Sequence, residues 1–324
     1  MKAVVQDRYG SPDDLEIRDI DKPVAAEDEV LVRIRAASAN AYDWHVMRGD
    51  PYIPARLGMG LRRPRAKIRG RDFAGVVEAV GAKVTGLRPG DEVFGEVDGT
   101  FAEYVCVRDT MVGPKPASLT FEQAAAVPLA GNTALMGLRD RGRVQPGQQV
   151  LINGASGGVG TFAVQIAAWL GAEVTGVCST RNVDLVRSLG AHHVIDYTQV
   201  DFTRTGQRYD VVLDMVANRS LADCRRAVTP TGTLVLGGGG TPGRLIGAAG
   251  LTVRALALSP FVRQRLVLLI GPAPSKENLA TLRGLADSGK ITPTIDRTYP
   301  LSEAPEAIRY LEVEHARGKV VVTV

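Results

Sequence analysis

The sequence predicts an α/β protein in which a doubly wound parallel-sheet domain is inserted into an antiparallel, barrel-like domain. Three observations predict this arrangement. Residues 150–167 have the pattern of a strand, a glycine-rich turn and a helix; apolar strands alternate with helical segments from 173 to 258; and short strands of alternating polarity occupy 30–107 and return at 319–324. The 324 residues are enough for two domains that each bury a core.

The glycine-rich turn is the most informative of these features. The apolar run 150–153 ends in Gly154-Ala155-Ser156-Gly157-Gly158-Val159-Gly160, and helix periodicity begins at Thr161. Glycines at such a turn let the backbone approach a pyrophosphate, and the free N–H groups and dipole of the next helix attract its charge. The spacing departs from the usual G-x-G-x-x-G, but the flanking strand and helix supply the context that the motif requires. The alternative is a strand–helix turn that binds no ligand.

The rest of the middle region continues the alternation of strands and helices. A helix is expected over 182–189, ended by Gly190. Further strands are expected at 173–178, 193–196, 209–214, 232–236 and 252–258. Continuous apolar strands that alternate with helices favour a parallel sheet covered on both faces, and right-handed crossovers then give a doubly wound domain.

The first part of the chain has shorter strands, expected at 30–36, 73–80, 91–96 and 101–107 and separated by turns such as 88–91. The tail 319–324 alternates in the same way, so we expect it to return to the first domain. The predicted boundaries place the first domain at 1–125, completed by 290–324, and the inserted domain at 126–289.

Composition limits the function classes. Apolar residues make up 45% and charged residues 23%, which is typical of a globular protein, and no apolar run is long enough to span a bilayer. The net charge of +4 permits anion binding but is too small to indicate nucleic acid. The scattered cysteines, Cys106, Cys178 and Cys224, fit a reduced cytoplasm, so a cytoplasmic location is expected. Six basic residues within 62–71 form either a solvated loop or a rim that steers an anionic ligand.

Several motifs together resemble the medium-chain dehydrogenase/reductase superfamily, specifically its zinc-free quinone-oxidoreductase branch, over the whole chain. They are Asn40-Ala41-Tyr42-Asp43-Trp44, Gly70-Arg71-Asp72-Phe73-Ala74-Gly75, Arg88-Pro89-Gly90-Asp91, Gly99-Thr100-Phe101-Ala102-Glu103-Tyr104, the glycine turn and His315-Ala316-Arg317-Gly318-Lys319. The resemblance implies a GroES-like domain carrying a Rossmann domain, with the active site in the cleft between them. It also implies a small-molecule substrate, no nucleic-acid or membrane partner, and a homodimer.

The same resemblance bears on metal binding. Zinc-binding members place a Cys at or near the position of Asn40 and a Gly-His-Glu where this chain has Gly70-Arg71-Asp72. A guanidinium has no free lone pair, so Arg71 cannot ligate zinc, and no Cys lies between Met1 and Phe101. The sequence therefore predicts no metal site. Without a metal to stabilise an alkoxide, simple alcohol oxidation is disfavoured.

Cofactor choice is read from the end of the second strand of the doubly wound domain. An NAD-preferring site carries Asp or Glu there, whereas this chain has Ser179-Thr180-Arg181. Hydroxyls and a guanidinium suit the 2′-phosphate of NADPH, with no carboxylate expected to repel it. The alternative is that Ser179 only caps the helix that follows.

Further cofactor contacts are implied by the resemblance: Thr133 near the nicotinamide, the strand end at Gly237 facing the carboxamide, Tyr197 supporting the adenosine phosphate, and the His315 stretch closing over the cofactor. The alternative for His315, Arg317 and Lys319 is a solvated helix end. The predicted cofactor-binding residues are thus Thr133, Ser156, Gly157, Gly158, Val159, Gly160, Ser179, Thr180, Arg181, Tyr197, Gly237, His315, Arg317 and Lys319.

Catalysis is predicted for Asn40, His45 and Tyr52. Hydride addition to an enone leaves an enolate, which needs a hydrogen-bond donor and a proton. Asn40 is a plausible amide donor, and His45 stands where some quinone oxidoreductases carry a tyrosine. Tyr42 and Tyr52 compete for the same role, His45 can equally be packed on a helix face, and the cofactor ribose or water can supply the proton.

The function that the sequence predicts is NADPH-dependent, zinc-independent reduction of quinones or α,β-unsaturated carbonyls. Two alternatives remain at this stage. An enoyl-thioester reductase would use the basic run at 62–71 to meet the phosphates of a carrier. A non-catalytic NADPH-binding protein is suggested by the crystallin-like relatives of the family.

Overall fold

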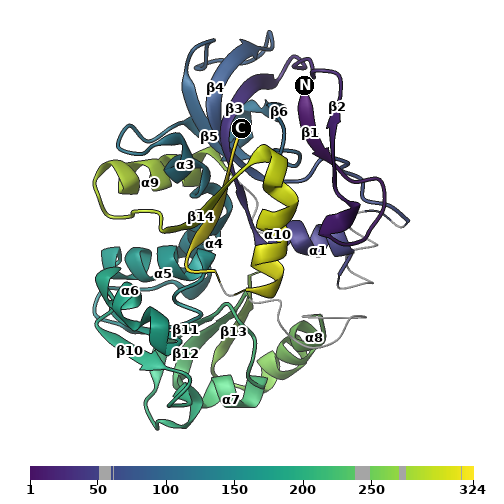
Figure 1. Cartoon of the computed structure of the whole chain (residues 1–324). Helices are drawn as coiled ribbons and strands as arrows, with labels where there is room; N and C mark the ends of the chain where they lie inside the picture. Colours follow the sequence, from purple (N-terminus) through teal and green to yellow (C-terminus); the bar gives the residue numbers. More distant parts are fainter. Residues whose placement is uncertain (51–59, 61, 238–248, 270–274, 315) are drawn as a thin grey trace. The chain divides into compact units, whose positions relative to one another are not determined.

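The computed structural model describes residues 1–50, 60, 62–237, 249–269, 275–314 and 316–324 (Figure 1). The chain divides into two compact units, Met1–Asn132 with Ala273–Val324, and Thr133–Pro272. The first unit has a largely antiparallel sheet and the second has the doubly wound parallel sheet, as the predicted fold class requires.

The first unit is organised around a sheet for which the described residues supply seven strands in the order β14-β15-β3-β4-β5-β7, with β6 paired to β3. Its strands are β3 (Glu29–Ala39), β4 (Asp72–Val80), β5 (Glu92–Glu96), β6 (Tyr104–Arg108), β7 (Val112–Pro114), β14 (Ile295–Pro300) and β15 (Lys319–Thr323). The β14–β15 pair is parallel and the other pairs are antiparallel. A separate hairpin pairs β1 (Lys2–Val5) with β2 (Glu16–Asp19).

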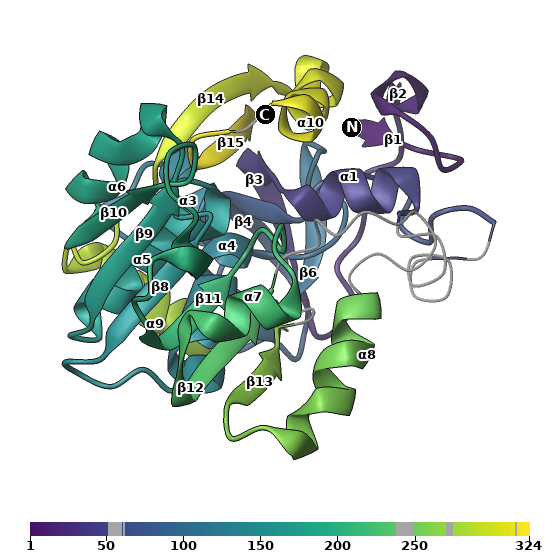
Figure 2. The ribbon, with the colours of Figure 1, turned by 90° about the horizontal axis from the view of Figure 1, so that it is seen from below.

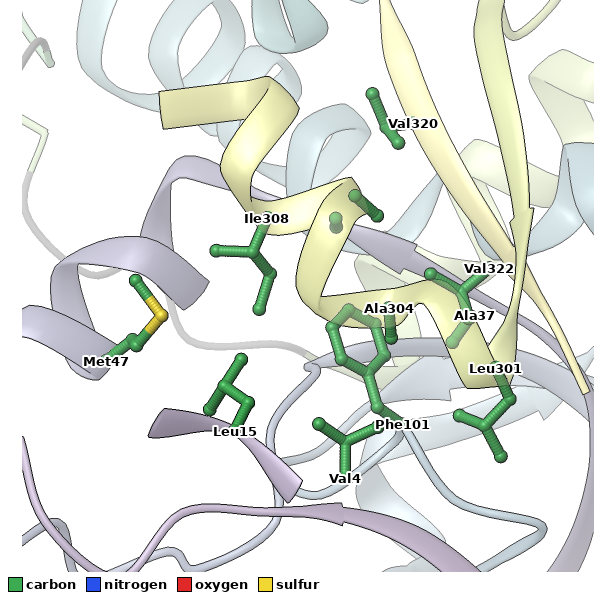
Figure 3. Close-up of a cluster of buried hydrophobic side chains, with 12 residues drawn as sticks. Val4, Leu15, Ala37, Met47, Phe101, Leu301, Ala304, Ile308, Val320 and Val322 are labelled. Carbon is green, nitrogen blue, oxygen red and sulfur yellow. The ribbon is translucent and has the colours of Figure 1, made fainter. Parts of the chain in front are cut away.

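The C-terminal strand lies beside the end of β3. In its antiparallel register Val320 is opposite Ala39 and Val322 is opposite Ala37. This pairing brings residue 319 next to the point where β3 ends and helix α1 (Ala41–Arg48) begins. Side chains from α1, from β15 and from α10 (Ala304–Val313) meet in one buried cluster that includes Met47, Ile308 and Val322 (Figure 3). The cluster fixes the position of α1 and therefore of the polar residues at its N-terminus.

Helix α9 (Lys276–Asp287) belongs to the first unit, although the expected boundary at 289/290 places it in the inserted domain. Its contacts explain the difference. Asn278 donates from Nδ2 to Asn132 Oδ1 over 2.7 Å, and the Lys276 ammonium lies 2.8 Å from the Asp109 carboxylate. Ser118 Oγ also donates to the Ala286 carbonyl over 3.2 Å. These partners are remote in sequence, so the pattern of the chain alone did not indicate them. The same unit contains α3 (Phe121–Ala125), and α4 (Pro128–Leu135) spans the boundary between the units.

In the second unit, the described residues form a six-stranded parallel sheet in the order β10-β9-β8-β11-β12-β13. The strands are β8 (Gln149–Asn153), β9 (Glu173–Cys178), β10 (His193–Asp196), β11 (Tyr209–Asp214), β12 (Val228–Leu236) and β13 (Arg265–Leu268). The order reverses between β8 and β11, and ligands of doubly wound sheets bind at the carboxyl ends of strands beside such a switch point. The topology therefore directs attention to residues 153–160 and 214–218.

Helices cover the sheet of the second unit. Leu221 and Cys224 of α7 (Leu221–Arg226) and Ala255 of α8 (Ala249–Leu258) pack against strand residues such as Leu151 and Val212. Figure 2 shows α7 beside β11 and β12. The sheet also contacts α5 (Gly158–Trp169), α6 (Val183–Ser188) and the π-helical segment η3 (Met136–Gly142). Among the described helices, none is long and apolar enough to cross a membrane.

The strand expected at 252–258 is wrong, because these residues lie in α8, and the sixth strand of the sheet is β13. Leu251, Ala255 and Leu258 face the core cluster with helical spacing, whereas Val253 and Leu256 are 64% and 60% exposed. The apolar residues of 251–258 fit both the two-residue period of a strand and the 3.6-residue period of a helix. Packing of one helical face against α7 selects the helix.

Candidate functional site

The glycine turn joins β8 to α5. The chain leaves the strand through Gly154, whose φ of +89° favours glycine, and Gly157 is the N-cap residue of the helix with extended backbone angles. A Cβ on Gly160 would lie 2.0 Å from the Gly154 carbonyl oxygen, so this position accepts glycine alone. Gly157 is different, because an added Cβ would come no closer than 3.5 Å to the same oxygen.

The N-terminus of α5 leaves its first hydrogen-bond donors open. The bond from Thr161 N to the Gly157 carbonyl is 2.9 Å long and begins the helical series, and no side chain caps the helix. The N–H groups of Gly158, Val159 and Gly160 thus have no intrahelical acceptor. Open donors at the positive end of a helix dipole fit the pyrophosphate of a dinucleotide. The predicted residues Gly157, Gly158, Val159 and Gly160 form this N-terminus, and their contact with a dinucleotide stays a prediction.

Asn182 links the glycine turn to the loop after β9. Its Nδ2 lies 3.0 Å from Ser156 Oγ and 3.3 Å from Ser179 Oγ, and its side chain is buried. The structure therefore brings together two predicted cofactor residues from separate strand ends. Asn182 was not singled out by the sequence, and a polar residue directly after Ser179-Thr180-Arg181 was the signal available.

The expectation that no carboxylate lies near this loop is wrong. Thr180 Oγ1 donates to Asp196 Oδ2 over 2.6 Å, and the same hydroxyl lies 3.0 Å from Thr198 Oγ1. The Thr180 hydrogen bond lowers the pKa of Asp196, so this carboxyl is ionised at neutral pH. Parallel pairing places Asp196 opposite Cys178, immediately before Ser179. Arg181 and Tyr197 are exposed at this edge of the sheet.

A second polar group follows the neighbouring strand end. Asn153, the last residue of β8, donates from Nδ2 to Asp214 Oδ1 over 2.9 Å, and Asp214 is the last residue of β11. Asp214 Oδ1 also accepts from the backbone N–H groups of Val216 and Ala217. The predicted residue Gly237 donates its N–H to the Asp214 carbonyl over 2.9 Å. This network shapes the switch point. In the sequence, it is indicated by the polar residues that end two buried strands.

The remaining cofactor predictions have different surroundings. Thr133 is buried in α4, and Arg317 is exposed, with its N–H donating to Asp296 Oδ2 over 3.1 Å. His315, like the catalytic candidate Tyr52, lies outside the described residues.

A buried network surrounds the N-terminus of α1 in the first unit. Asn40 donates from Nδ2 to the Ser38 carbonyl at 3.2 Å and to Asp72 Oδ2 at 3.0 Å, and its Oδ1 accepts from the Lys319 ammonium. The ammonium also lies 3.4 Å from Asp72 Oδ2. Asp72 accepts further hydrogen bonds from Ser38 Oγ and from the N–H of Leu129. A buried charge pair of this kind persists because hydrogen bonds satisfy its remaining polar atoms.

These contacts argue against two of the predicted roles. Both amide hydrogens of Asn40 are used inside the protein, so none is left to donate to a substrate oxygen. Lys319 is 2% exposed, and its ammonium is turned to Asn40 and Asp72 rather than to solvent. Both residues have the contacts of groups that hold the N-terminus of α1 in place.

His45 has one ring nitrogen in use. Its Nδ1 lies 3.0 Å from the Asp50 carbonyl, which can only accept, so Nδ1 carries the proton and neutral Nε2 is an acceptor. Burial lowers the pKa of His45, which favours this neutral form. The ring also stacks on Trp44, with centroids 3.6 Å apart. The predicted proton-donor role is therefore disfavoured at neutral pH.

Arg71 orders the side chains around Tyr42. Its Nε donates to Glu96 Oε1 over 2.6 Å and its Nη1 to Asp98 Oδ1 over 3.1 Å. The guanidinium carbon lies 4.7 Å from the centroid of the Tyr42 ring, and the Tyr42 hydroxyl is 3.4 Å from Asp98 Oδ1. Burial, with the nearby Asp98 carboxylate, raises the pKa of Tyr42, so its hydroxyl stays protonated.

Within the described ranges, no group of three or more His, Cys, Asp or Glu side chains is placed to hold a metal.

A pocket of about 260 Å³ lies beside α1, lined by Tyr42, Asp43 and Val46 of the helix and by Arg65, Ala66, Ile68, Arg69, Gly70 and Asp98. Asp43 Oδ2 accepts from the N–H of Asn40 over 2.7 Å, and burial raises the pKa of Asp43 to about 7. The pocket thus presents a phenol, the guanidinium groups of Arg65 and Arg69, and the carboxyl groups of Asp43 and Asp98, of which Asp43 titrates near neutrality. Such a set can hold a small polar group and exchange protons with it.

Comparison with known families matches both units. Residues 26–117 are similar to the alcohol dehydrogenase GroES-like domain, and residues 189–322 are similar to the domain described as zinc-binding dehydrogenase.

Individual proteins are similar over nearly the whole chain. The Homo sapiens protein named mitochondrial NAD(P)H oxidoreductase RTN4IP1 is 36% identical, covering 100% of this chain and 89% of that protein. The chloroplastic NADPH-dependent alkenal/one oxidoreductase of Arabidopsis thaliana is 34% identical, covering 99% and 79%. The solved quinone oxidoreductase from Coxiella burnetii superposes with a TM-score of 0.85 at 31% identity, covering 100% of this chain and 99% of that one.

Proposed function

The chain belongs to the quinone-oxidoreductase branch of the medium-chain dehydrogenase/reductase superfamily, and we propose on this premise that it reduces quinones or α,β-unsaturated carbonyls with NADPH and without zinc. It is an NAD(P)H-dependent oxidoreductase, as its relatives are named. The finer points concern the phosphate specificity, the proton donor and the metal.

The observation that carries the proposal is the open N-terminus of α5. Three backbone donors and no side-chain cap stand at the carboxyl end of β8, beside the switch point of the sheet. The bound cofactor would supply a hydride to an electron-poor carbon of the substrate. The residues of this chain then have two tasks, to hold the pyrophosphate at α5 and to stabilise the charge that develops on the substrate oxygen.

Tyr42 is the donor that we assign to that oxygen. Its hydroxyl is protonated at neutral pH, and its contact with Asp98 is long enough, at 3.4 Å, for the hydroxyl to turn to a substrate. Arg71 fixes the ring from one face while Glu96 and Asp98 fix Arg71. Asn40 and His45 have no free N–H to donate at neutral pH. The amide hydrogens of Asn40 and the Nδ1–H of His45 are already bonded inside the protein.

The proposal of zinc independence rests on Arg71. Zinc-binding members of the superfamily have a histidine ligand at this position, and here a guanidinium occupies it and is bonded to Glu96 and Asp98. Elemental analysis of the purified chain is expected to find less than stoichiometric zinc, and a chelator is expected to leave activity intact. One zinc per chain, with activity lost to the chelator, would contradict this.

NADPH is proposed over NADH because Ser179, Arg181 and Tyr197 lie at the end of β9 and β10. Asp196 opposes the preference, since its carboxylate, at the end of β10, is bonded to Thr180 in the loop after β9. A charge-assisted contact from Arg181 to the 2′-phosphate is worth roughly 1.5–3 kcal/mol, so about a tenfold preference for NADPH is expected. Fluorescence titration with both nucleotides tests this, and Arg181→Ala is expected to narrow the difference. Equal dissociation constants in the unmodified protein would rule the preference out.

The experiment that tests the function is stopped-flow NADPH oxidation across quinones, enones and enoyl thioesters. Rapid oxidation with quinones or enones is expected, and Tyr42→Phe is expected to lower kcat at least about tenfold while NADPH affinity is unchanged. Fast turnover of enoyl thioesters alone would favour the carrier-linked reductase. Tight NADPH binding with no turnover of any substrate would leave a non-catalytic binding protein.

Two further expectations stay predictions. The two curated relatives named above are mitochondrial and chloroplastic, and the expected cytoplasmic location of this chain is testable by fractionation. The expected homodimer is testable by light scattering.

A further inference from the structure

Arg69 is a buried guanidinium with an unused donor. The residue is 3% exposed and lines the pocket beside α1. Its Nη2 donates to the Ala66 carbonyl, whereas its Nε is buried and has no hydrogen-bond partner in the described part of the chain. No described carboxylate lies within ion-pair distance of it, since its acidic neighbours act only at longer range. A buried charged donor without a partner is costly, and such a group is typical of a site that a ligand completes.

The surroundings restrict what the ligand can be. The guanidinium groups of Arg69 and Arg65 exclude a cation and favour an electron-rich oxygen, and Asp43 and Asp98 in the same lining disfavour a multiply charged anion. A volume of about 260 Å³ is below the range of about 300–1,000 Å³ usual for drug-sized ligands. The pocket therefore suits one small ring or chain end that bears a single polarised or mono-anionic oxygen.

We propose that this pocket is an oxyanion subsite in which Arg69 Nε–H binds the oxygen of a small enone or quinone, with the Tyr42 hydroxyl on the same pocket wall as second donor. The proposal rests on the proposed function for the identity of the substrate. When a hydride adds to the β-carbon of an enone, the C=C electron pair moves toward the carbonyl and the oxygen becomes an enolate. Arg69 stabilises that charge without giving up a proton, and the α-carbon takes its proton from solvent.

The test uses 4-nitrophenol, a non-reacting ring whose phenolate and phenol forms differ in visible absorbance. Titrated into the purified full chain without nucleotide, the phenolate is expected to bind in preference to the phenol, so the apparent pKa of bound 4-nitrophenol falls. Arg69→Met is expected to weaken phenolate binding by about tenfold or more, because a hydrogen bond to a charged group is lost. Arg62→Met is the matched control, because Arg62 is an exposed member of the same basic segment that does not line the pocket. Its affinity is expected to match that of the unmodified protein.

If Arg69→Met does not fold, as judged by circular dichroism, Arg69→Gln keeps an amide donor and most of the volume but removes the charge, and it is expected to lose the preference for phenolate over phenol. Unchanged phenolate affinity in either folded variant overturns the subsite, as does absence of phenolate binding to the unmodified chain. Phenolate binding that depends on Arg69, in a protein that reduces neither enones nor quinones, would instead overturn the proposed function and leave the subsite standing.

Discussion

The N-termini of α5 and α1 differ in the hydrogen bonds that their cap residues make. At α5 the cap is Gly157, no side chain makes a capping hydrogen bond, and the first N–H groups are left open. At α1 the cap is Asn40, whose own N–H is bonded to Asp43 and whose amide is bonded to Ser38, Asp72 and Lys319. A helix end with open donors is suited to binding an anion, whereas one saturated by side chains is suited to holding its neighbours in position. We expect substitutions at the first to change nucleotide affinity and substitutions at the second to change stability.

The largest effect is expected for Asp72→Ala. The substitution leaves the Lys319 ammonium buried without its carboxylate, and breaking a buried ion pair in this way costs about 3–5 kcal/mol of unfolding free energy. Urea unfolding measures it. Glu27→Gln is the control, because the Glu27–Lys83 pair is exposed and its loss should cost about 0–1 kcal/mol. Similar losses in both variants would mean that the network at α1 does not have the energetic character assigned to it.

The pH dependence of stability is expected to report Asp43 in the same network. Burial raises the pKa of Asp43 from 3.8 to about 7, so between these values the folded chain holds a proton that the unfolded chain has released. Unfolding free energy should therefore fall as pH rises from about 4 to about 7, by up to about 4 kcal/mol at 1.36 kcal/mol per unit.

Asp43→Asn is expected to reduce that slope by the contribution of Asp43, because an amide does not titrate, whereas Glu96, whose pKa burial also raises to about 7, keeps its own contribution. Urea unfolding at a series of pH values compares the two proteins. An unchanged slope in Asp43→Asn would assign the whole dependence to other groups such as Glu96.

At α5, the two glycines distinguish affinity from folding. Gly157→Ala places its Cβ in ordinary contact, 3.5 Å from the Gly154 carbonyl, so stability should change by less than about 1 kcal/mol. The methyl group stands at the open N-terminus, however, and NADPH affinity should fall about tenfold, which is about 1.4 kcal/mol.

Gly160→Ala is the companion variant. Its Cβ would lie 2.0 Å from the same carbonyl oxygen, so both affinity and stability should fall. Nucleotide titration and thermal unfolding of both variants give the contrast. If Gly157→Ala bound NADPH as well as the unmodified chain, the open N-terminus would not be the pyrophosphate site.

The smallest effect is expected at the other end of the nucleotide. Asp196→Asn removes a carboxylate bonded to Thr180 and so reduces repulsion of a 2′-phosphate. The preference for NADPH over NADH should rise only a few-fold, because solvent screens an exposed charge. Paired titrations with both nucleotides measure it. A lower preference would show that Asp196 supports phosphate binding through Thr180.

Local features of this protein were predictable because the residues that produce them are adjacent in sequence. The strand, turn and helix at 149–169 follow from an apolar run, glycines at close-packed positions and helical periodicity, all within 21 residues. The parallel sheet followed from the repeated alternation of strands and helices. Residues 252–258 are helical where a strand was expected, because this apolar stretch fits the periods of both a strand and a helix. The spacing of Leu251, Ala255 and Leu258 is that of one helical face.

Site residues were harder to predict where their partners come from other elements. Thr180 was correctly placed after the second strand of the parallel sheet, but Asp196 follows the next strand and is brought beside it only by parallel pairing. Arg69 looked like one of six equivalent basic residues in the segment 62–71. Its burial beside Asp43 and the pocket distinguishes it from the exposed members of that run, and no local pattern marks the difference.

The sequence by itself determined the strand, turn and helix at 149–169 and the alternation that forms the parallel sheet, since those properties depend on neighbouring residues and backbone freedom. Only the tertiary structure decided which polar groups at Asn40 are already used. Asp72 lies 32 residues beyond Asn40 and Lys319 a further 247 residues on, and the pairing of β15 and β4 with β3 is what brings their charges together. The residue type decides whether a side chain can donate a hydrogen bond. Because a hydrogen bond depends on distance in space, only the fold decides whether that donor is free for a substrate.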